Sequence, residues 1–154
     1  MSSQVFTKGM DVLDHLAPKT HGFSAWVQLV RAYNYLEARI SADLRDDDLT
    51  LAQMDVLVML YGKGVISQQE LADFLFVTKG NVVGLIDRLS LRGFVERQSS
   101  DSDRRVNLLH LTTEGRKLVE GVLPRQRELI SRLMSTLCED EAIVLERLLA
   151  RLKV

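Results

Sequence analysis

The segment 67–111 constrains the fold of this chain most strongly, because it places two short helices directly before two strands. Ser67-Gln68-Gln69-Glu70 has the form of a capping box, in which a serine hydroxyl and a glutamate carboxylate satisfy free N–H groups at a helix start. A second helix is predicted over 78–93, ending in a glycine. Two short helices with a link of three or four residues are typical of a helix-turn-helix, although Phe76-Val77 replaces the usual turn glycine.

Two strands are predicted after this helix pair. Residues 94–97 and 106–111 are rich in apolar and β-branched side chains, and the polar stretch 98–105 between them suits the tip of a hairpin. The tip ends in two adjacent arginines, Arg104 and Arg105. A helix-turn-helix followed by a hairpin with a basic tip is a winged helix-turn-helix.

Helices are also predicted on both sides of this unit, from apolar residues spaced near 3.6 positions. We expect a kink rather than a break at Pro124, because proline removes one helical hydrogen bond. The predicted fold class is therefore mainly α with a small β-hairpin wing. The flanking helices are expected at 5–17, 22–46, 50–61 (with a capping box at Thr50-Leu51-Ala52-Gln53), 112–137, and after Cys138-Glu139-Asp140.

Two local expectations accompany these helices. The acidic run Asp46-Asp47-Asp48 ends the helix 22–46 and is expected to form a solvated turn. In the first helix of the pair, Leu71, Phe74 and Leu75 are expected to face inward.

The division of the chain follows from its apolar stripes. The stripes at 5–17, 129–137 and 145–152 exceed what a winged lobe of about 70 residues can cover, and obligate dimer interfaces are large and apolar in this way. We therefore expect residues 1–20 and 116–154 to form a helical dimerisation region. Residues 21–115 are expected to form the winged helix-turn-helix lobe, with the helix 22–46 linking the two.

DNA binding is predicted from the start of the second helix, where residues 78–84 read Thr-Lys-Gly-Asn-Val-Val-Gly. Each glycine there destabilises the helix by about 1 kcal/mol relative to alanine. Such small residues are expected where the helix backbone must approach another surface closely. Lys79 can bond a guanine or a phosphate, and Asn81 can pair with adenine through two hydrogen bonds. The predicted DNA-binding residues are Ser67, Gln69, Thr78, Lys79, Gly80, Asn81, Arg88, Asp103, Arg104 and Arg105.

These residues have different expected roles. Free N–H groups at the helix starts near Ser67 and Thr78 suit phosphate, and Arg88 is placed for the sugar-phosphate backbone unless it pairs with an acidic neighbour on its own helix. An arginine at the wing tip suits a narrow, electronegative minor groove. Asp103 repels phosphate, so we expect it to brace an arginine or cap the turn.

Net charge and cysteine content limit which functions and cellular locations the chain can have. The net charge is −1, and the stretch 79–105 holds six basic against four acidic residues, a mild excess that does not by itself indicate DNA binding. A single cysteine, Cys138, excludes an internal disulfide and suits a reducing cytoplasm, the expected location, with no membrane partner. The acidic residues after Cys138 oppose a reactive thiolate, and His15, His21 and His110 lie on three predicted elements, so neither redox nor metal sensing is indicated.

Two other function classes fit the residues less well. The chain has no nucleophile elbow, phosphate-binding glycine loop or paired-carboxylate motif, so we predict that it is not an enzyme and needs no cofactor. The alternative to a DNA reader is a winged helix that binds only protein. Such a module would lack the polar helix start and the arginine tip.

The segments from Val77 to Arg97 and from Asp101 to Gly115 resemble the MarR family of bacterial transcriptional regulators. The resemblance covers about residues 20–153. The positions at family spacing are Leu89 and Gly93 before the first wing strand, Asp103 and Arg105 in the wing, and Leu111, Thr112 and Gly115 after the second strand.

The resemblance implies a triangular homodimer whose terminal helices interlock and whose two winged lobes read the half-sites of a pseudo-palindromic operator. Many relatives are repressors that a small, often aromatic or phenolic, anion releases from DNA by binding between the dimerisation helices and the lobe. Residues His21, Trp26, Tyr33 and Tyr61 are the candidates for contacting such an effector, although aromatic residues more often belong to a packed core.

Overall fold

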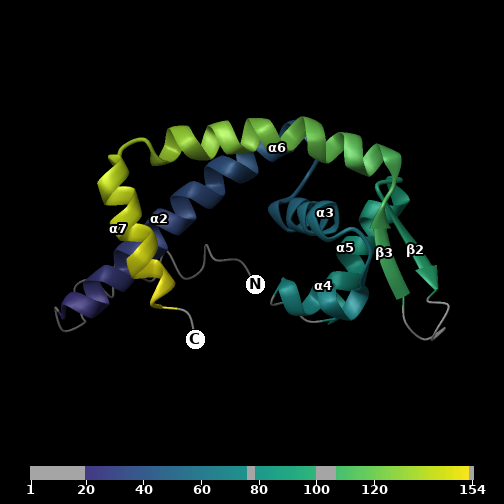
Figure 1. Cartoon of the computed structure of the whole chain (residues 1–154), viewed down its shortest axis with the longest axis horizontal. Helices are drawn as coiled ribbons and strands as arrows, with labels where there is room; N and C mark the ends of the chain where they lie inside the picture. The colour runs from purple at the N-terminus through teal and green to yellow at the C-terminus, as the bar shows by residue number, and fades with distance from the viewer. Residues whose placement is uncertain (1–19, 76–78, 100–106, 153–154) are drawn as a thin grey trace. The chain divides into compact units, whose positions relative to one another are not determined.

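The computed structural model describes residues 20–75, 79–99 and 107–152 (Figure 1). By contacts these residues form two compact units: the lobe, Leu44–Glu128, and a terminal unit made of the described residues up to Asp43 and from Leu129 onward. The elements are α2 (His21–Leu44), the 3-10 turn η1 (Arg45–Asp47), α3 (Leu51–Lys63), β1 (Ile66–Ser67), α4 (Gln68–Phe74), α5 (Lys79–Leu91), β2 (Val95–Ser99), β3 (Asn107–Leu111), α6 (Thr113–Met134) and α7 (Glu139–Ala150).

The wing is formed by β2 and β3 (Figure 1), which belong to a three-stranded antiparallel sheet of order β1-β3-β2. The two predicted strands pair over their whole length, from Val95 opposite Leu111 to Ser99 opposite Asn107. The third strand was not predicted, because β1 has only two residues and exists only through its pairing with β3, where Ile66 lies opposite Leu109. The winged fold is thus confirmed, with one more strand than the sequence indicated.

Both predicted capping boxes are formed. At α3, the Gln53 N–H donates to the Thr50 hydroxyl over 3.2 Å, and the Thr50 N–H donates to the Gln53 side chain over 2.9 Å. At α4, the Glu70 N–H donates to the Ser67 hydroxyl over 3.1 Å, and the Ser67 N–H donates to the Glu70 carboxylate over 2.7 Å. The hydrogen bonds from Ser67 lower the pKa of Glu70, because they stabilise the carboxylate. The two helix starts are therefore set by local sequence.

The core of the lobe joins the helix pair to the wing. Leu57 on α3, Leu71 on α4, Ile86 on α5 and Leu109 on β3 are fully buried. Helices α3 and α4 each contact both α5 and β3. Burying one such side chain stabilises the fold by about 1.5–3 kcal/mol. The helix pair and the wing therefore share one core.

Two glycines close the base of the wing. Gly93 ends α5 with a φ of 74°, and the next N–H, that of Phe94, donates back to the Leu89 carbonyl over 3.0 Å, as in a Schellman motif. A Cβ on Gly115 would lie 2.1 Å from the Phe94 carbonyl oxygen, so only glycine fits there. Thr112 completes the joint, since its hydroxyl donates to the Gly93 carbonyl over 2.7 Å and its N–H to that of Phe94 over 3.1 Å.

The remaining helices agree with the predicted pattern where the structure describes them. Helix α2 covers nearly all of the predicted range 22–46, and α6 runs unbroken through Pro124. Helix α7 begins directly after Cys138. The predicted helix 5–17 lies outside the described residues. None of the described helices combines the length and the hydrophobicity that a membrane crossing requires.

Two local expectations were wrong. Phe74 does not face inward: it is 44% exposed at the end of α4, which has only seven residues and buries Leu71 and Ala72, and the Lys63 ammonium lies 5.1 Å from its ring centroid. The run 46–48 is not simply solvated, because the Asp47 carboxylate pairs with the Arg125 guanidinium of α6. Both differences depend on side chains that come from other elements of the lobe.

Candidate nucleic-acid interface

Helix α5 has one buried and one open side. Val82, Ile86 and Leu89 are fully buried and fix the helix in the core of the lobe. Asn81 at its start is exposed, and a Cβ built on Gly80 would meet no atom within 4 Å. Gly80 and Asn81 therefore lie at the surface, on a helix that cannot rotate without breaking the core.

Val83 is a surface residue that the sequence analysis did not single out. It is 38% exposed on the same helix as Asn81, although its type and its neighbour Val82 suggest a core position. Valine methyl groups can contact the 5-methyl group of thymine in the major groove. The helical period is the signal that could have found it: Val83 lies three positions after Gly80 and so shares its face.

Arg88 lies exposed on α5, and its side chain turns back along the helix. Its Nε donates to the Gly84 carbonyl over 2.9 Å, and a Cβ on Gly84 would lie 3.4 Å from its Nη2. The contact is thus with a backbone oxygen and not with an acidic neighbour. This contact occupies one N–H of a guanidinium that carries five.

Two other arginines near α5 are held by protein groups. Arg97 on β2 pairs with Asp87 on α5 over 2.5 Å, which ties the wing to the helix. Arg92, directly after α5, donates to the backbone carbonyls of Asp47 and Asp48. The excess of basic residues counted over 79–105 therefore overstates the charge that this region offers to DNA.

The predicted residues of α4 have local partners. The Ser67 hydroxyl accepts the capping hydrogen bond from Glu70, and Gln69 donates from its Nε2 to the Asp73 carboxylate over 2.7 Å on the exposed face of the helix. Ser67 has a structural role that does not require DNA. Gln69 is exposed and remains a predicted DNA contact.

Several predicted contacts lie outside the described residues. They are Thr78, Asp103, Arg104 and Arg105, and the side chain of Lys79, of which only the backbone at the start of α5 is described. Their roles in DNA binding stay predictions.

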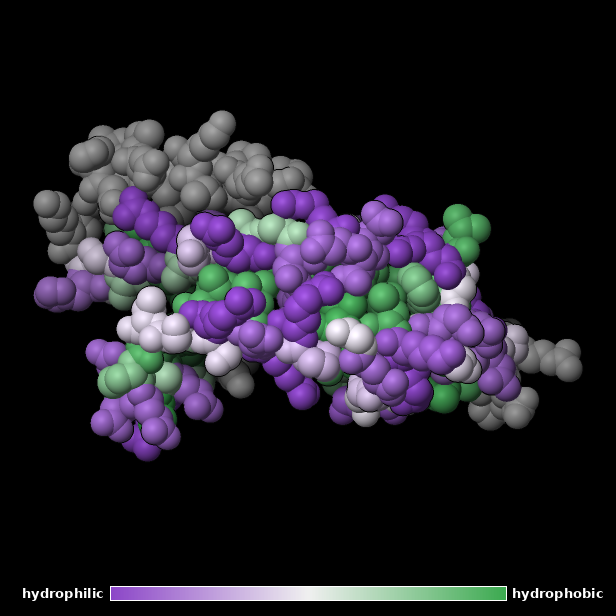
Figure 2. All heavy atoms as spheres, turned by 90° about the horizontal axis from the view of Figure 1, so that it is seen from above, coloured by the Kyte–Doolittle hydropathy of each residue, from purple (hydrophilic) through white to green (hydrophobic). Residues whose placement is uncertain are grey.

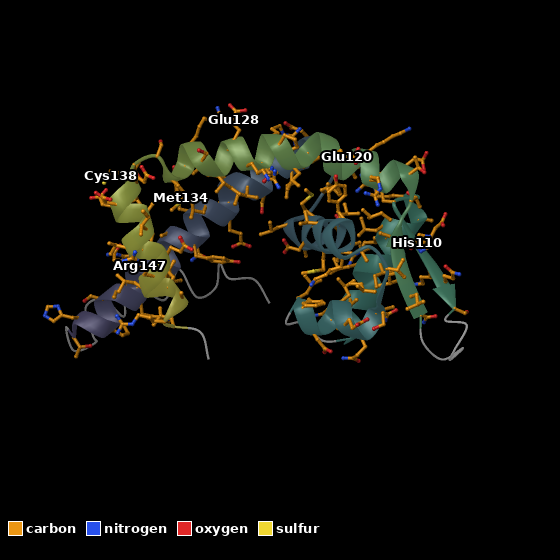
Figure 3. The ribbon with its side chains drawn as sticks, viewed as in Figure 1. His110, Glu120, Glu128, Met134, Cys138 and Arg147 are labelled. Carbon is orange, nitrogen blue, oxygen red and sulfur yellow. The ribbon has the colours of Figure 1, made fainter. Side chains whose placement is uncertain are left out.

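The candidate effector residues belong to different units. His21, Trp26 and Tyr33 lie on α2, where Trp26 is 39% and Tyr33 56% exposed, and the Trp26 ring lies 5.5 Å from that of Phe23. Tyr61 lies in the lobe, where its hydroxyl donates over 3.3 Å to Glu120 of α6 and the Arg116 guanidinium lies 5.2 Å from its ring centroid. Glu120 is labelled in Figure 3. Tyr61 is thus already engaged within the lobe.

The titratable side chains labelled in Figure 3 form no metal site. His110 on β3 lies opposite Glu96 on β2, with 3.2 Å between Nε2 and the carboxylate, and Cys138 is exposed at the start of α7. Within the described ranges, no three histidine, cysteine or acidic residues gather closely enough to hold a metal ion.

The chain is similar to a known protein family and to known regulators. A model of the MarR family matches residues 47–106. The chain is 30% identical over 113 residues to YfiV of Bacillus subtilis, an uncharacterized HTH-type transcriptional regulator, covering 70% of this chain and 71% of that protein.

Solved structures are also similar. A mutant MarR from E. coli complexed with operator DNA matches with a TM-score of 0.80 and 26% identity, over 92% of this chain and 98% of that one. BpsR of Bordetella bronchiseptica, whose DNA binding is regulated by 6-hydroxynicotinic acid, matches with a TM-score of 0.78 and 28% identity, over 88% of this chain and 96% of that one.

The second helix of the pair has one face buried in the core of the lobe and the other exposed, and a hairpin wing follows it. This arrangement defines a winged helix-turn-helix protein. The relatives that share it are transcriptional regulators and not enzymes. This chain belongs to the MarR family of transcriptional regulators.

Proposed function

We propose that this protein is a homodimeric regulator that reads a pseudo-palindromic operator, with α5 in the major groove and the wing in the adjacent minor groove. The observation that carries the proposal is the exposure of the small Gly80 and the polar Asn81 at the start of α5, on a helix whose other side is fully buried. A rigid helix with free side chains at its start is what base reading requires. The similarity to a MarR bound to operator DNA supports the same arrangement.

The dimer is supported by the terminal unit. Large apolar side chains lie exposed on α7 in the single chain, among them Val144, Leu148 and Leu149. A second copy would bury them. We keep the division predicted from the sequence, with residues 1–20 and 116–154 in the dimerisation region, although contacts within one chain group Leu44–Glu128 together. The chromosomal target also fits the predicted cytoplasmic location.

We further propose that the protein represses its target genes and that a small aromatic anion releases it. The support is BpsR, a neighbour regulated by an aromatic acid. His21, Trp26 and Tyr33 remain candidates for binding the effector. Tyr61 can offer its hydroxyl to an effector only if its bond to Glu120 breaks.

The first experiment titrates labelled promoter fragments from the source genome with the purified protein at several salt concentrations. A DNA reader binds with an affinity that falls steeply with salt, and it prefers the native fragment to a scrambled duplex of equal length. A winged helix that binds only protein gives no complex with either duplex even in dilute buffer, and that result would reject the proposal.

Asn81→Ala tests the base-reading role of α5. We expect a loss of about 1–3 kcal/mol on the native operator and a relaxed preference at one base pair in each half-site, because the two hydrogen bonds to adenine are removed. The measurement is competition binding against operators that vary at single positions. An equal loss on every sequence would show that Asn81 touches only the DNA backbone.

A further inference from the structure

Three side chains join parts of the lobe that are far apart in the sequence, and all three contacts meet at the turn η1. Arg92 donates from Nη1 to the Asp48 carbonyl over 2.6 Å and from Nη2 to the Asp47 carbonyl over 3.0 Å. The Asp47 carboxylate pairs with Arg125 on α6. We call Asp47, Arg92 and Arg125 the η1 clamp.

Contacts within the protein hold the Arg92 guanidinium in place, whereas a phosphate-binding arginine needs a mobile side chain. Its two donors reach two consecutive carbonyls, a geometry that needs the planar fork of a guanidinium. Its guanidinium carbon also lies 4.9 Å from the centroid of the Phe94 ring, where cation–π attraction holds it. Lysine can reproduce the charge but not the paired hydrogen bonds.

The clamp lies at three junctions of the lobe. Arg92 follows the last residue of α5, and Asp47 lies three residues after the end of α2 at Leu44. Arg125 lies in α6, shortly before Glu128, where the lobe ends by contacts. The end of the DNA-reading helix is therefore bonded to the turn where the chain enters the lobe, and that turn is bonded to the helix by which the chain leaves it.

We propose that Asp47, Arg92 and Arg125 are positioning residues for operator binding, which hold the C-terminal end of α5 at the angle that the groove requires. The proposal rests on the proposed function. The buried stripe of α5 stops the helix from rotating about its own axis, whereas a bond at one end fixes its tilt. Arg92 and Arg125 therefore contribute to DNA affinity without touching DNA, although both are basic.

The discriminating pair of variants is Arg92→Lys and Arg92→Met. If Arg92 positions α5, both lower operator affinity about tenfold and leave the salt dependence unchanged, because no phosphate contact is lost. If Arg92 instead binds a phosphate, the lysine variant keeps its affinity, and the methionine variant loses about one unit of the salt slope. Wild-type affinity in Arg92→Lys would overturn the proposal.

The ion pair between Asp47 and Arg125 is tested with Asp47→Asn, Arg125→Met and their combination. We expect each single variant to lower operator affinity about tenfold and the double variant to lose no more than either, since both break one ion pair. Arg127→Met is the matched control, because Arg127 is an exposed arginine two positions further along α6. Additive losses, or an equal loss in the control, would contradict the clamp.

Amide hydrogen exchange on the DNA-free protein separates this proposal from the proposed function. The Gly93 and Phe94 amides, which bond back to Ser90 and Leu89, should exchange faster in all clamp variants while the amides of α3 do not. Unchanged exchange at these two amides refutes the clamp even if the protein binds its operator. A wild-type protein that binds no promoter refutes the proposed function, and the exchange still reports whether the clamp exists.

Discussion

The lobe and the terminal unit differ in where their large apolar side chains lie. Nearly every buried hydrophobic residue among those described belongs to Leu44–Glu128, and Val27 is the exception. Most of the exposed large ones belong to the terminal unit, on α2, the end of α6 and α7. The space-filling view shows hydrophobic side chains lying open among hydrophilic ones (Figure 2).

This difference indicates that the two units are stabilised in different ways. The lobe closes its own core with helices and a small sheet. The apolar residues of α7 line only a shallow hollow on that one helix, formed by Asp140, Glu141, Val144, Leu145 and Leu148. Exposed apolar area of this kind is typical of surfaces that become buried when a protein forms an oligomer. The lobe should therefore fold within one chain, whereas the terminal unit should depend on a partner.

The largest expected effect comes from charging the exposed face of α7. Val144→Lys with Leu148→Lys should weaken dimerisation about a thousandfold, roughly 4 kcal/mol, because each change places an unpaired charge in the proposed interface. Both residues are more than half exposed in one chain, so the helix itself should persist. Sedimentation equilibrium measures the dimer, and circular dichroism checks the helix.

The control for this prediction makes the same change in the lobe. Leu91 is 90% exposed at the end of α5, and Leu91→Lys should leave the dimer intact. If the α7 variant dimerises as tightly as the wild type, the terminal unit does not need a partner through this face and the contrast between the units fails.

A smaller effect is expected at the closed base of the wing. Gly115→Ala places a methyl group 2.1 Å from the Phe94 carbonyl oxygen, and backbone on both sides cannot yield cheaply. We expect a loss of about 3 kcal/mol in the free energy of unfolding of the lobe, measured by urea denaturation. Gly121→Ala is the matched control on the same helix, because its Cβ meets nothing within 4 Å. That variant should gain up to about 1 kcal/mol, and equal behaviour of the two would refute the close approach.

The smallest effect is expected at the end of α5. Gly93 has a φ of 74°, which costs an L-residue about 1 kcal/mol, so Gly93→Ala should lower the stability of the lobe by about that amount. Gly62 lies within α3 at negative φ with open space around it, and Gly62→Ala should be neutral or slightly stabilising. Thermal unfolding of both variants is the measurement. A neutral Gly93→Ala would show that the turn relaxes without strain.

The predictable parts of the fold are those stabilised by neighbours in the chain. Ser67 and Glu70 cap α4 through hydrogen bonds between residues three positions apart, so the residue types and their spacing suffice to predict the helix start. The wing strands follow from alternation and from a polar connection. On α5, the exposure of Asn81 was predictable, because a polar residue at a helix start seldom belongs to the core.

The parts that could not be predicted depend on residues distant in the sequence. Arg92 was counted as a basic residue near DNA, yet its partners are carbonyl oxygens 44 and 45 positions away. Asp47 reads as part of a solvated acidic run, but its partner Arg125 is 78 positions further along. Strand β1 likewise exists only because β3 lies beside it.

Helix starts, helix ends and the apolar stripes were thus determined by the sequence alone, because the interactions that produce them join residues within one or two helical turns of each other. Which arginines are free for a ligand, and why position 115 admits only glycine, depended on folding. Those properties come from electrostatic pairing and from close contact between segments that meet only once the core has closed.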